Sequence, residues 1–275
     1  RKTAALLALA VMFTGCSAPA ESESGAALPD VVGSMDIRYA EQFSVDYLAD
    51  GSALAEVADG RRYLIIPDGG EVPEQLPEDV TVISQPENIY LASSSSMDLF
   101  SSLDCLGDIL ASSTPESGWK LPEIAQAMAD EDILYAGKYS SPDIELLMSE
   151  GCDLAIENMM IYHSPKTAEQ IESCGIPVFI ERSSAESHPL GRLEWVRLYG
   201  LMLGKSDEAE KFFSEKCSLL DEVTSRESTG CTAAFFYISS NGSAVVRKPG
   251  DYISKMIELA GGKYVFTAGD LNVDE

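Results

Sequence analysis

The spacing of hydrophobic positions changes along this chain, and each spacing predicts a different element. Between residues 31 and 67, apolar and polar residues alternate in short runs, and Asp59-Gly60 marks a turn, so we predict a β-hairpin there. From residue 80 to residue 181, short apolar runs such as VTVIS, NIYLA, CDLAIE and IPVFIE alternate with helical segments. This alternation predicts an α/β fold, in which a parallel sheet carries helices on its faces.

The stretch HPLGRLEWVRLYGLMLGKSDEAEKFFSEK, residues 188–216, predicts a long helix. Pro189 fits a first-turn position, and apolar residues cover so much of the circumference that we expect burial on more than one side. Gly204 is a position at which this helix can kink or break, with Ser206 available to cap a continuation.

After the long helix, CTAAFFYIS predicts a strand and DYISKMIELAGG a helix, so α/β structure resumes. We divide the folded part into an N-terminal α/β lobe (31–187), a linker helix (188–225) and the start of a C-terminal α/β lobe (226–275). The last of these is too short to complete a sheet, so we expect the C-terminal lobe to be incomplete in this sequence.

The first residues have the pattern of an export signal. Two basic residues precede the apolar run AALLALAVMF, which is too short to span a bilayer durably. The following FTGC resembles the lipobox of bacterial lipoproteins, which implies a signal peptide over residues 1–15 and a lipid anchor on Cys16. A plain secretory signal is the alternative. Residues 16–30 lack hydrophobic periodicity, so we expect a lipidated tether that holds the folded part at the extracytoplasmic face of the cytoplasmic membrane.

Charge and motif content argue against several classes of function. The net charge of -26 makes nucleic acid an improbable partner, because phosphate binding needs a basic surface. A bare zinc or manganese site needs several converging histidines and carboxylates, and the chain has two histidines. A GxSxG motif is absent, and neither His163 nor His188 has an evident Ser or Cys partner, so we predict no enzyme and no catalytic residues. The cysteines after Cys16 lack paired spacing, and we expect no disulfide.

Three segments resemble the substrate-binding lipoproteins of ABC importers for iron complexes and corrinoids. AGKYSSPDIELLMSEGCDLAI is similar to that family's glycine loop, helix start and strand, TAEQIESCGIPVFIE to its helix and Gly-Ile-Pro-Val strand, and HPLGRLEWVRLYGLMLGKSDEAEKFF to its linker helix. The resemblance covers about Val31 to Val265. It implies two Rossmann-like lobes joined by one long helix, a ligand held in the interlobe cleft, and delivery to an ABC permease with its ATPase.

Candidate ligand-binding residues follow the predicted strands, because open α/β sheets present ligand sites at the carboxyl ends of their strands. We select charged, aromatic and sulfur-containing side chains at these positions: Lys138, Tyr139, Met159, Tyr162, His163 and Arg182 in the first lobe, and Tyr237, Arg247 and Tyr252 in the second. Ordinary loop polarity is the alternative for each. The resemblance also implies that Glu145 docks to permease arginines, although an acidic residue on a first helical turn also stabilises the helix dipole.

The charges of these loops leave the ligand open. Arg182, Arg247 and Lys138 could neutralise an anionic siderophore. Glu157 and Glu181 also follow strands, and they would favour a neutral or partly cationic chelate if both faced the cleft.

We favour a ferric siderophore as ligand, with a corrinoid or haem as alternatives in the same transport role. His163 is a candidate ligand of a haem or corrinoid metal, with a solvent-facing histidine as the alternative. The run Ser93 to Met97 opens a helix, so its hydroxyl and N–H groups could meet an anionic ligand, while a cap by Ser96 explains the same residues. A surface sensor lipoprotein without a transport role is the other functional class. We expect a monomer without a resident cofactor or metal ion.

Overall fold

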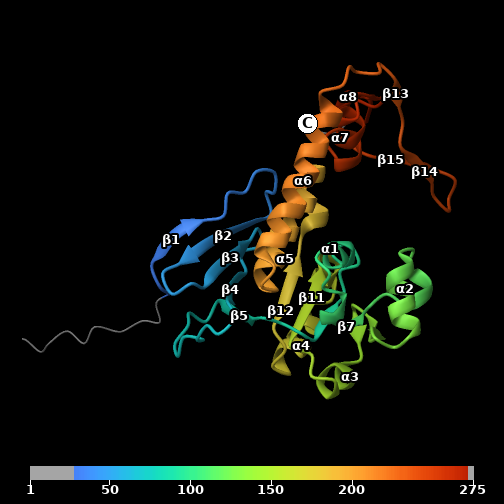
Figure 1. Cartoon of the computed structure of the whole chain (residues 1–275). Helices are drawn as coiled ribbons and strands as arrows, with labels where there is room; N and C mark the ends of the chain where they lie inside the picture. Colours follow the sequence, from blue (N-terminus) through green and yellow to red (C-terminus); the bar gives the residue numbers. More distant parts are fainter. Residues whose placement is uncertain (1–27, 272–275) are drawn as a thin grey trace, which may run out of the picture.

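A computed structural model describes residues 28–271, in which a larger lower lobe and a smaller upper part are connected by helices (Figure 1). The signal peptide, most of the tether and Cys16 lie outside the described residues. The lower lobe begins with sheet A, which has the order β1-β2-β3-β4-β5 and is antiparallel except for the β4-β5 pair. Its strands are β1 (Val31–Ser34), β2 (Phe43–Leu48), β3 (Ala53–Val57), β4 (Arg62–Ile66) and β5 (Val80–Ser84).

Sheet B is the parallel sheet that the alternating pattern predicted. It has the order β12-β11-β6-β7-β8, and all four pairings are parallel. Its strands are β6 (Ile89–Leu91), β7 (Ile109–Ser112), β8 (Leu134–Tyr135), β11 (Leu154–Asn158) and β12 (Val178–Glu181). The predicted neighbours VTVIS and NIYLA therefore belong to two different sheets, as β5 and β6.

Helices and short ladders connect the strands of sheet B. They are α1 (Met97–Ser102), α2 (Pro122–Ala129), β9 (Gly137–Lys138), β10 (Ser141–Pro142), α3 (Ile144–Ser149), the 3-10 helix η3 (Met159–His163), α4 (Pro165–Ser173) and the 3-10 helix η4 (Ser183–Ala185). Two further 3-10 turns, η1 (Leu106–Asp108) and η2 (Glu116–Gly118), flank β7.

Apolar layers cover both faces of sheet B. On one face, Ile156 and Phe179 join sheet A, α1 and the helices that follow β12 in the largest cluster of buried side chains. On the other face, Ala155 and Ile180 pack with α3 and α4. A smaller cluster around Leu64 lies on the outer face of sheet A. Sheet A is thus part of the lower lobe's core.

The segment predicted as a linker helix forms two helices, α5 (Pro189–Met202) and α6 (Ser206–Thr224), so one helix over 188–225 is wrong and the break allowed at Gly204 is confirmed. Ser206 is the first residue of α6 and does not cap it. The chain reverses at Gly204, which has φ +66°, a conformation that glycine adopts without strain. Gly200 then lies so close to α6 that an added Cβ would be 2.8 Å from the carbonyl oxygen of Lys205. Arg197 meets Glu210 at 2.8 Å, which shows that the two helices pack antiparallel.

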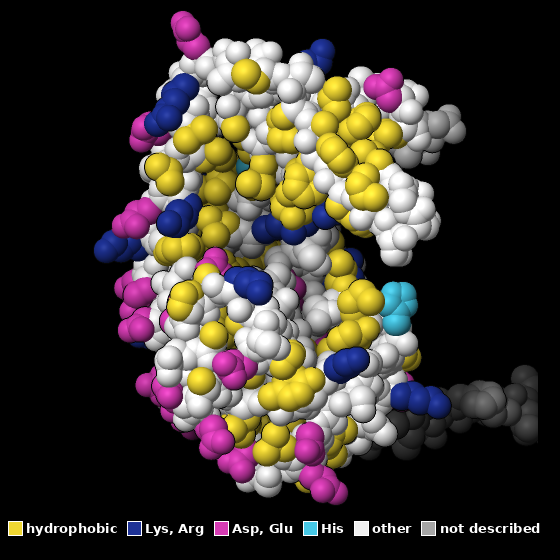
Figure 2. All heavy atoms as spheres, turned by 90° about the vertical axis from the view of Figure 1, so that its right-hand side faces the viewer, with side chains coloured by type: hydrophobic (Ala, Val, Ile, Leu, Met, Phe, Trp, Pro, Cys, Tyr) yellow, Lys and Arg dark blue, Asp and Glu magenta, His cyan; other side chains and the backbone are white. Residues whose placement is uncertain are grey.

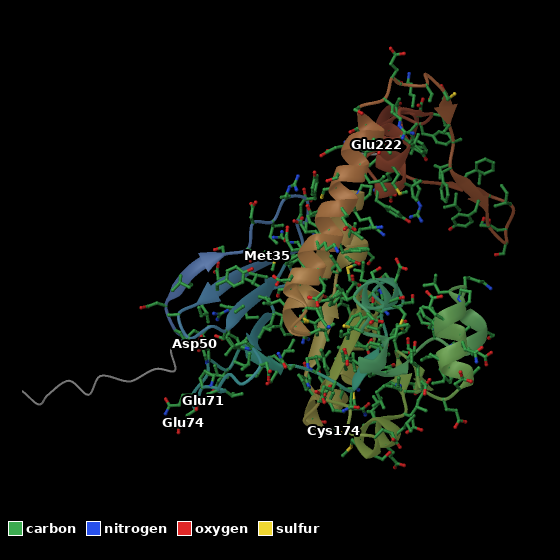
Figure 3. The ribbon with its side chains drawn as sticks, in the orientation of Figure 1. Met35, Asp50, Glu71, Glu74, Cys174 and Glu222 are labelled. Atoms are coloured by element: carbon green, nitrogen blue, oxygen red, sulfur yellow. The ribbon has the colours of Figure 1, made fainter. Side chains whose placement is uncertain are left out.

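Burial of α5 on several sides is confirmed. Pro189 occupies its first turn, and its buried residues, which include Trp195, Tyr199 and the charged Glu194, face sheet A, α1 and α6. Only α6 continues into the upper part, where Glu222 lies near its end, whereas Asp50, Glu71 and Glu74 lie at the far lower end of sheet A (Figure 3).

The upper part contains the predicted second stretch of α/β structure. The helix expected in DYISKMIELAGG is confirmed as α7, but CTAAFFYIS splits into β13, which pairs with β16, and β14, which pairs with β15. The elements are β13 (Thr232–Ala233), β14 (Phe236–Ile238), β15 (Ala244–Val246), α7 (Tyr252–Leu259), β16 (Lys263–Tyr264) and α8 (Ala268–Leu271). Between residues 28 and 271, none of the helices has the length and apolar character that a membrane span requires.

Candidate ligand-binding site

The carboxyl ends of the five strands of sheet B lie at one edge, because all of them run in the same direction. This edge faces the upper part, and Figure 2 shows an open hollow between the two parts of the molecule. Basic side chains lie on both sides of this hollow, while acidic side chains are more frequent along the outer surface (Figure 2). The edge therefore has the position expected for a ligand site of an open α/β sheet.

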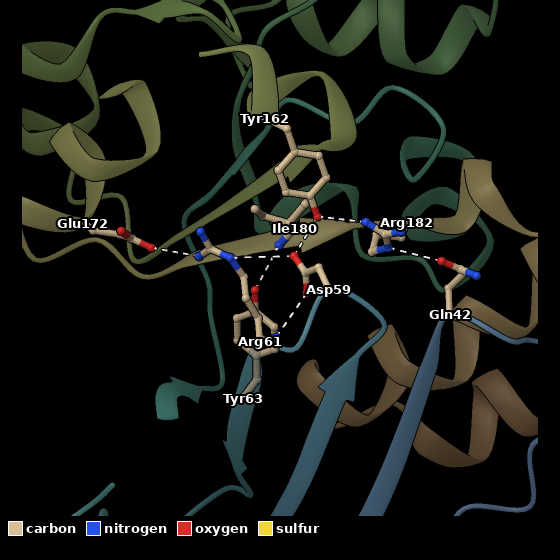
Figure 4. Close-up of polar contacts among 8 residues, drawn as sticks. All are labelled: Gln42, Asp59, Arg61, Tyr63, Tyr162, Glu172, Ile180 and Arg182. Carbon is tan, nitrogen blue, oxygen red and sulfur yellow. Dashed lines mark hydrogen bonds and ion pairs between the residues drawn. The ribbon is translucent and has the colours of Figure 1, made fainter. Parts of the chain in front are cut away.

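Arg182 and Tyr162 form the best-defined polar cluster at this edge (Figure 4). Arg182 directly follows β12, and its Nε donates to Oε1 of Gln42 at 3.2 Å, while its Nη1 donates to the Tyr162 hydroxyl at 3.0 Å. The same hydroxyl donates to Oδ2 of Asp59 at 2.6 Å. Two loops of sheet B and two segments of sheet A thus meet around one guanidinium group.

A second set of contacts joins the two sheets behind this cluster. Arg61 lies 3.7 Å from Asp59 and 3.1 Å from Glu172 of α4. The buried Tyr63 hydroxyl of β4 accepts a hydrogen bond from the Ile180 amide of β12 at 3.2 Å, and burial raises the pKa of this phenol. The amide of an edge strand is satisfied in this way, and sheet A is fixed against sheet B.

The protonation of Tyr162 decides how Arg182 is held. Burial, and then the hydrogen bond to Asp59, raise the pKa of the Tyr162 phenol, so it stays neutral near neutral pH. Both acceptors of Arg182 are therefore uncharged oxygens. Within residues 28–271, no carboxylate lies within 4.0 Å of the Arg182 guanidinium, so its positive charge has no ion-pair partner there.

Glu181 is buried, and its carboxyl group is hydrogen-bonded inside the lobe. Its carboxylate accepts hydrogen bonds from the hydroxyls of Ser93 at 2.9 Å and Ser95 at 3.3 Å, and from the Ser183 amide at 2.6 Å. The serine hydroxyls after β6 are therefore directed at this carboxylate. Ser96 makes no side-chain cap of α1 and instead shares a hydrogen bond with Tyr199.

Glu157 is also fully buried, but it has no hydrogen-bond partner among the described residues. The hydroxyl of Tyr90, on the same face of sheet B, is likewise unpaired there. Burial raises the pKa of Glu157 to about 8, so its carboxyl group is mostly protonated at neutral pH. Neither Glu157 nor Glu181 therefore exposes a negative charge to the hollow. The repulsion of an anionic ligand that the sequence suggested for these two residues is not expected.

The other candidates of the first lobe occupy neighbouring loops of the same edge. Lys138 is exposed in β9, and Tyr139 is half-buried against the apolar layer that contains Ala155. In η3, Met159 is half-buried and His163 is exposed. Among the described residues, no group of three or more His, Cys, Asp and Glu side chains is placed to hold a metal ion.

The candidates of the upper part are more dispersed. Tyr237 is 56% exposed on β14, and the Arg247 guanidinium lies 3.7 Å from Asp251. Tyr252 instead contacts the lower lobe, because the guanidinium of Arg192 in α5 lies 3.5 Å from the centre of its ring. The described residues show no hydrogen bond or ion pair from Tyr237 or Arg247 to the lower lobe.

Glu145 lies exposed in the first turn of α3. Asp143 caps this helix by accepting a hydrogen bond from the Leu146 amide at 3.0 Å. Glu145 is therefore free to contact a partner, although its position also suits the helix dipole.

Sequence patterns missed three residues that organise this region, Gln42, Asp59 and Arg192. Asp59 carried only a turn signal, through Asp59-Gly60, and the other two had no signal beyond polarity. Their contacts join segments as much as 140 residues apart in sequence, as Gln42 and Arg182 are. Local spacing does not report such contacts.

Comparison with known protein sequences finds one distant relative. No protein-family model matches the chain. An uncharacterized lipoprotein of Methanocaldococcus jannaschii is 24% identical over 234 residues, which are 78% of this chain and 54% of that protein. The chain therefore spans about half the length of this relative.

Solved structures show the same fold at low sequence identity. A periplasmic binding protein from Veillonella parvula has a TM-score of 0.57 at 17% identity, over 74% of this chain and 68% of that one. The periplasmic haem-binding protein HutB of Vibrio cholerae has a TM-score of 0.55 at 16% identity, over 66% of both chains. The petrobactin-binding protein YclQ of Bacillus subtilis has a TM-score of 0.51 at 12% identity, over 78% of this chain and 66% of that one. The expected α/β fold of two-lobed binding proteins is confirmed.

Proposed function

We propose that this protein is an extracytoplasmic substrate-binding protein that captures an iron chelate and delivers it to an ABC permease with its ATPase. The observation that carries this proposal is the Arg182 guanidinium, which neutral oxygens hold at the carboxyl edge of sheet B. The fold shared with haem- and petrobactin-binding proteins supports the same role. The lipid anchor on Cys16 and the docking role of Glu145 belong to this proposal.

The electrostatics of the edge favour a chelate with anionic groups. Arg182 lacks an ion-pair partner in the described region, and Lys138 is exposed on a neighbouring loop. Among the nearby acids, Glu157 is mostly protonated, Glu181 is hydrogen-bonded inside the lobe, and Asp59 is shared between the Tyr162 hydroxyl and Arg61. An uncompensated arginine binds carboxylate or catecholate oxygens with charge-assisted hydrogen bonds. A ferric siderophore is thus our first choice of ligand, with haem or a corrinoid as alternative ligands. A sensor role without transport is the alternative function.

A fluorescence titration of the full chain tests the proposal. Ferric complexes of a catecholate and of a hydroxamate siderophore, haemin and cobalamin are added separately, and the quenching of the two tryptophans is followed. We expect saturable quenching by the ferric catecholate. Arg182→Ala should weaken this binding about tenfold or more, because a charge-assisted hydrogen bond contributes about 1.5–3 kcal/mol.

Arg226→Ala is the matched control, because Arg226 is an exposed arginine whose guanidinium pairs with Glu222 on α6. This variant should bind like the unmodified protein. Equal affinities of the two arginine variants, or no quenching by any of the four ligands, would contradict the proposal.

A further inference from the structure

We propose that sheet A contributes to the ligand site through two positioning residues, Gln42 and Asp59. Gln42 orients Arg182 directly, and Asp59 orients Tyr162. This inference rests on the proposed function, because it assigns sheet A a role at the same site. Neither residue needs to touch the ligand. The argument starts from the geometry of the guanidinium group.

Arg182 has five N–H donors, and sheet A determines which of them stay available. Its Nε–H is taken by Gln42 and one N–H of Nη1 by Tyr162. These two hydrogen bonds fix the plane of the guanidinium. The remaining donors, which include both N–H groups of Nη2, have no partner in the described part of the chain. They form the group that can bind a ligand oxygen in a defined direction.

Asp59 acts on Arg182 through Tyr162. A phenol has a single proton, and at 2.6 Å the Tyr162 hydroxyl donates it to Asp59. An oxygen lone pair of the hydroxyl is then left for the Arg182 N–H at 3.0 Å. Without the Asp59 carboxylate, the hydroxyl proton could rotate to other directions, and the acceptor that orients Arg182 would be lost for part of the time.

The structure holds both positioning residues firmly. The Asp59 carboxylate accepts from the Arg61 amide at 3.2 Å within the turn that Gly60 closes at φ +88°. The backbone amide of Gln42 donates to the buried carboxylate of Glu186, which lies between η4 and α5, at 3.0 Å. Because its neighbours are fixed, the Arg182 guanidinium samples fewer orientations than that of an unbonded arginine on the surface. A group that is already oriented before the ligand binds increases affinity.

Affinity measurements with double variants test the inference. The probe is the 1:3 complex of Fe(III) with 2,3-dihydroxybenzoate, and the full chain is used. Gln42→Ala and Asp59→Ala should each weaken binding about three- to tenfold, because each removes one hydrogen bond that orients Arg182. In the Arg182→Ala background, the same two substitutions should change nothing.

Asp79→Ala is the matched control, because Asp79 adjoins sheet A and pairs with Arg62 at 2.9 Å without contacting this cluster. It should leave affinity unchanged in both backgrounds. A weakening by Asp59→Ala that persists in the Arg182→Ala background would overturn the inference, since Asp59 would then act without Arg182.

A titration of the phenol tests the link without any ligand. Asp59→Asn removes the charged acceptor and should lower the pKa of Tyr162, which ultraviolet absorbance can follow with Tyr162→Phe to assign the signal. An unchanged pKa would show that Asp59 does not accept the Tyr162 proton, and that result would overturn the inference.

Different results would contradict the proposed ligand site and the role of sheet A in it. If Arg182→Ala binds the probe normally, or the probe does not bind, the proposed ligand site is wrong, while the phenol titration still decides whether Asp59 orients Tyr162. If Arg182→Ala weakens binding but Gln42→Ala and Asp59→Ala behave like Asp79→Ala, the site stands and only the role of sheet A is wrong.

Discussion

The lower lobe and the upper part contain similar elements but differ in how their side chains are buried. In the lower lobe, three clusters of buried apolar residues enclose both sheets. Between residues 226 and 271, only Ser254, Tyr264 and Ala268 are buried, and all three residues of β14 are exposed. Because burial of apolar surface is the dominant stabilising term, the lower lobe has its own source of stability. The described residues of the upper part contact α5 and α6 through α7.

The largest expected difference between the two regions concerns aromatic truncation. Trp195 in α5 is fully buried, its ring lies 4.9 Å from that of Phe43, and its Nε1 donates to Glu186 at 3.0 Å. We expect Trp195→Ala to lower the free energy of unfolding by about 3–5 kcal/mol, because it leaves a cavity in the core. Chemical denaturation followed by circular dichroism measures this effect.

Phe236→Ala provides the comparison from the upper part. Phe236 is 56% exposed on β14, so its truncation should change the free energy of unfolding by less than about 0.5 kcal/mol. Similar losses in the two variants would contradict the difference in burial between the two regions over residues 28–271.

The next effect depends on pH and involves the unpaired Glu157. Its pKa rises from the usual 4.5 to about 8 in the folded protein, so the unfolded chain binds fewer protons between these values. Below about pH 4.5, Glu157 is neutral in both the folded and the unfolded protein and does not reduce the free energy of unfolding. As the pH rises towards 8, only the unfolded chain ionises freely, so the free energy of unfolding falls. We expect Glu157→Gln to raise the free energy of unfolding by about 3 kcal/mol at about pH 7, and by little at about pH 4.

Glu258→Gln on α7 is the control for this pH dependence, because Glu258 is exposed in the upper part. Its stability should follow that of the unmodified protein across the whole range. A Glu157→Gln curve parallel to the unmodified one would show that Glu157 has found a partner in solution.

The smallest expected effect concerns the contact between the two regions. Tyr252 of α7 lies over the Arg192 guanidinium at 3.5 Å, an arrangement that contributes about 1 kcal/mol. Tyr252→Leu keeps apolar volume but removes the aromatic face, so hydrogen exchange of the α7 amides should accelerate about fivefold. Exchange in sheet B should not change.

Tyr237→Leu is the matched substitution, since Tyr237 is exposed on β14. It should leave exchange in α7 unaltered. If Tyr252→Leu accelerates exchange in sheet B as much as in α7, the two regions unfold as one unit and the comparison fails.

Sequence patterns predicted those parts of the fold that local spacing determines. The repeated strand and helix segments specified sheet B, and Pro189 marked the start of α5. The reversal at Gly204 was not predicted, because a glycine after an apolar helix fits both a kink and a complete turn. The separation of β5 and β6 into different sheets was not predicted either, since strand partners are chosen by tertiary contacts.

The candidate site was predictable to a similar extent. Tyr162 and Arg182 were found because they follow strands, and the structure brings them together. The burial of Glu157 and Glu181 was not foreseen, because a polar residue at the end of a strand can face either the solvent or the core. Their neighbours decide this, and for Glu181 these include Ser93, 88 residues earlier in the chain.

The buried carboxylates of Glu186 and Glu194 also constrain the order in which the chain can fold. Together they accept hydrogen bonds from five consecutive backbone amides, those of residues 38–42, which precede them by 144–156 residues. At a synthesis rate of about 5–20 residues per second, the interval between the synthesis of these amides and the synthesis of their acceptors is roughly 8–30 s. Residues 38–42 therefore reach these native contacts only after a much later part of the chain has been made, and the entry of sheet A into the lobe is a late, long-range step of folding.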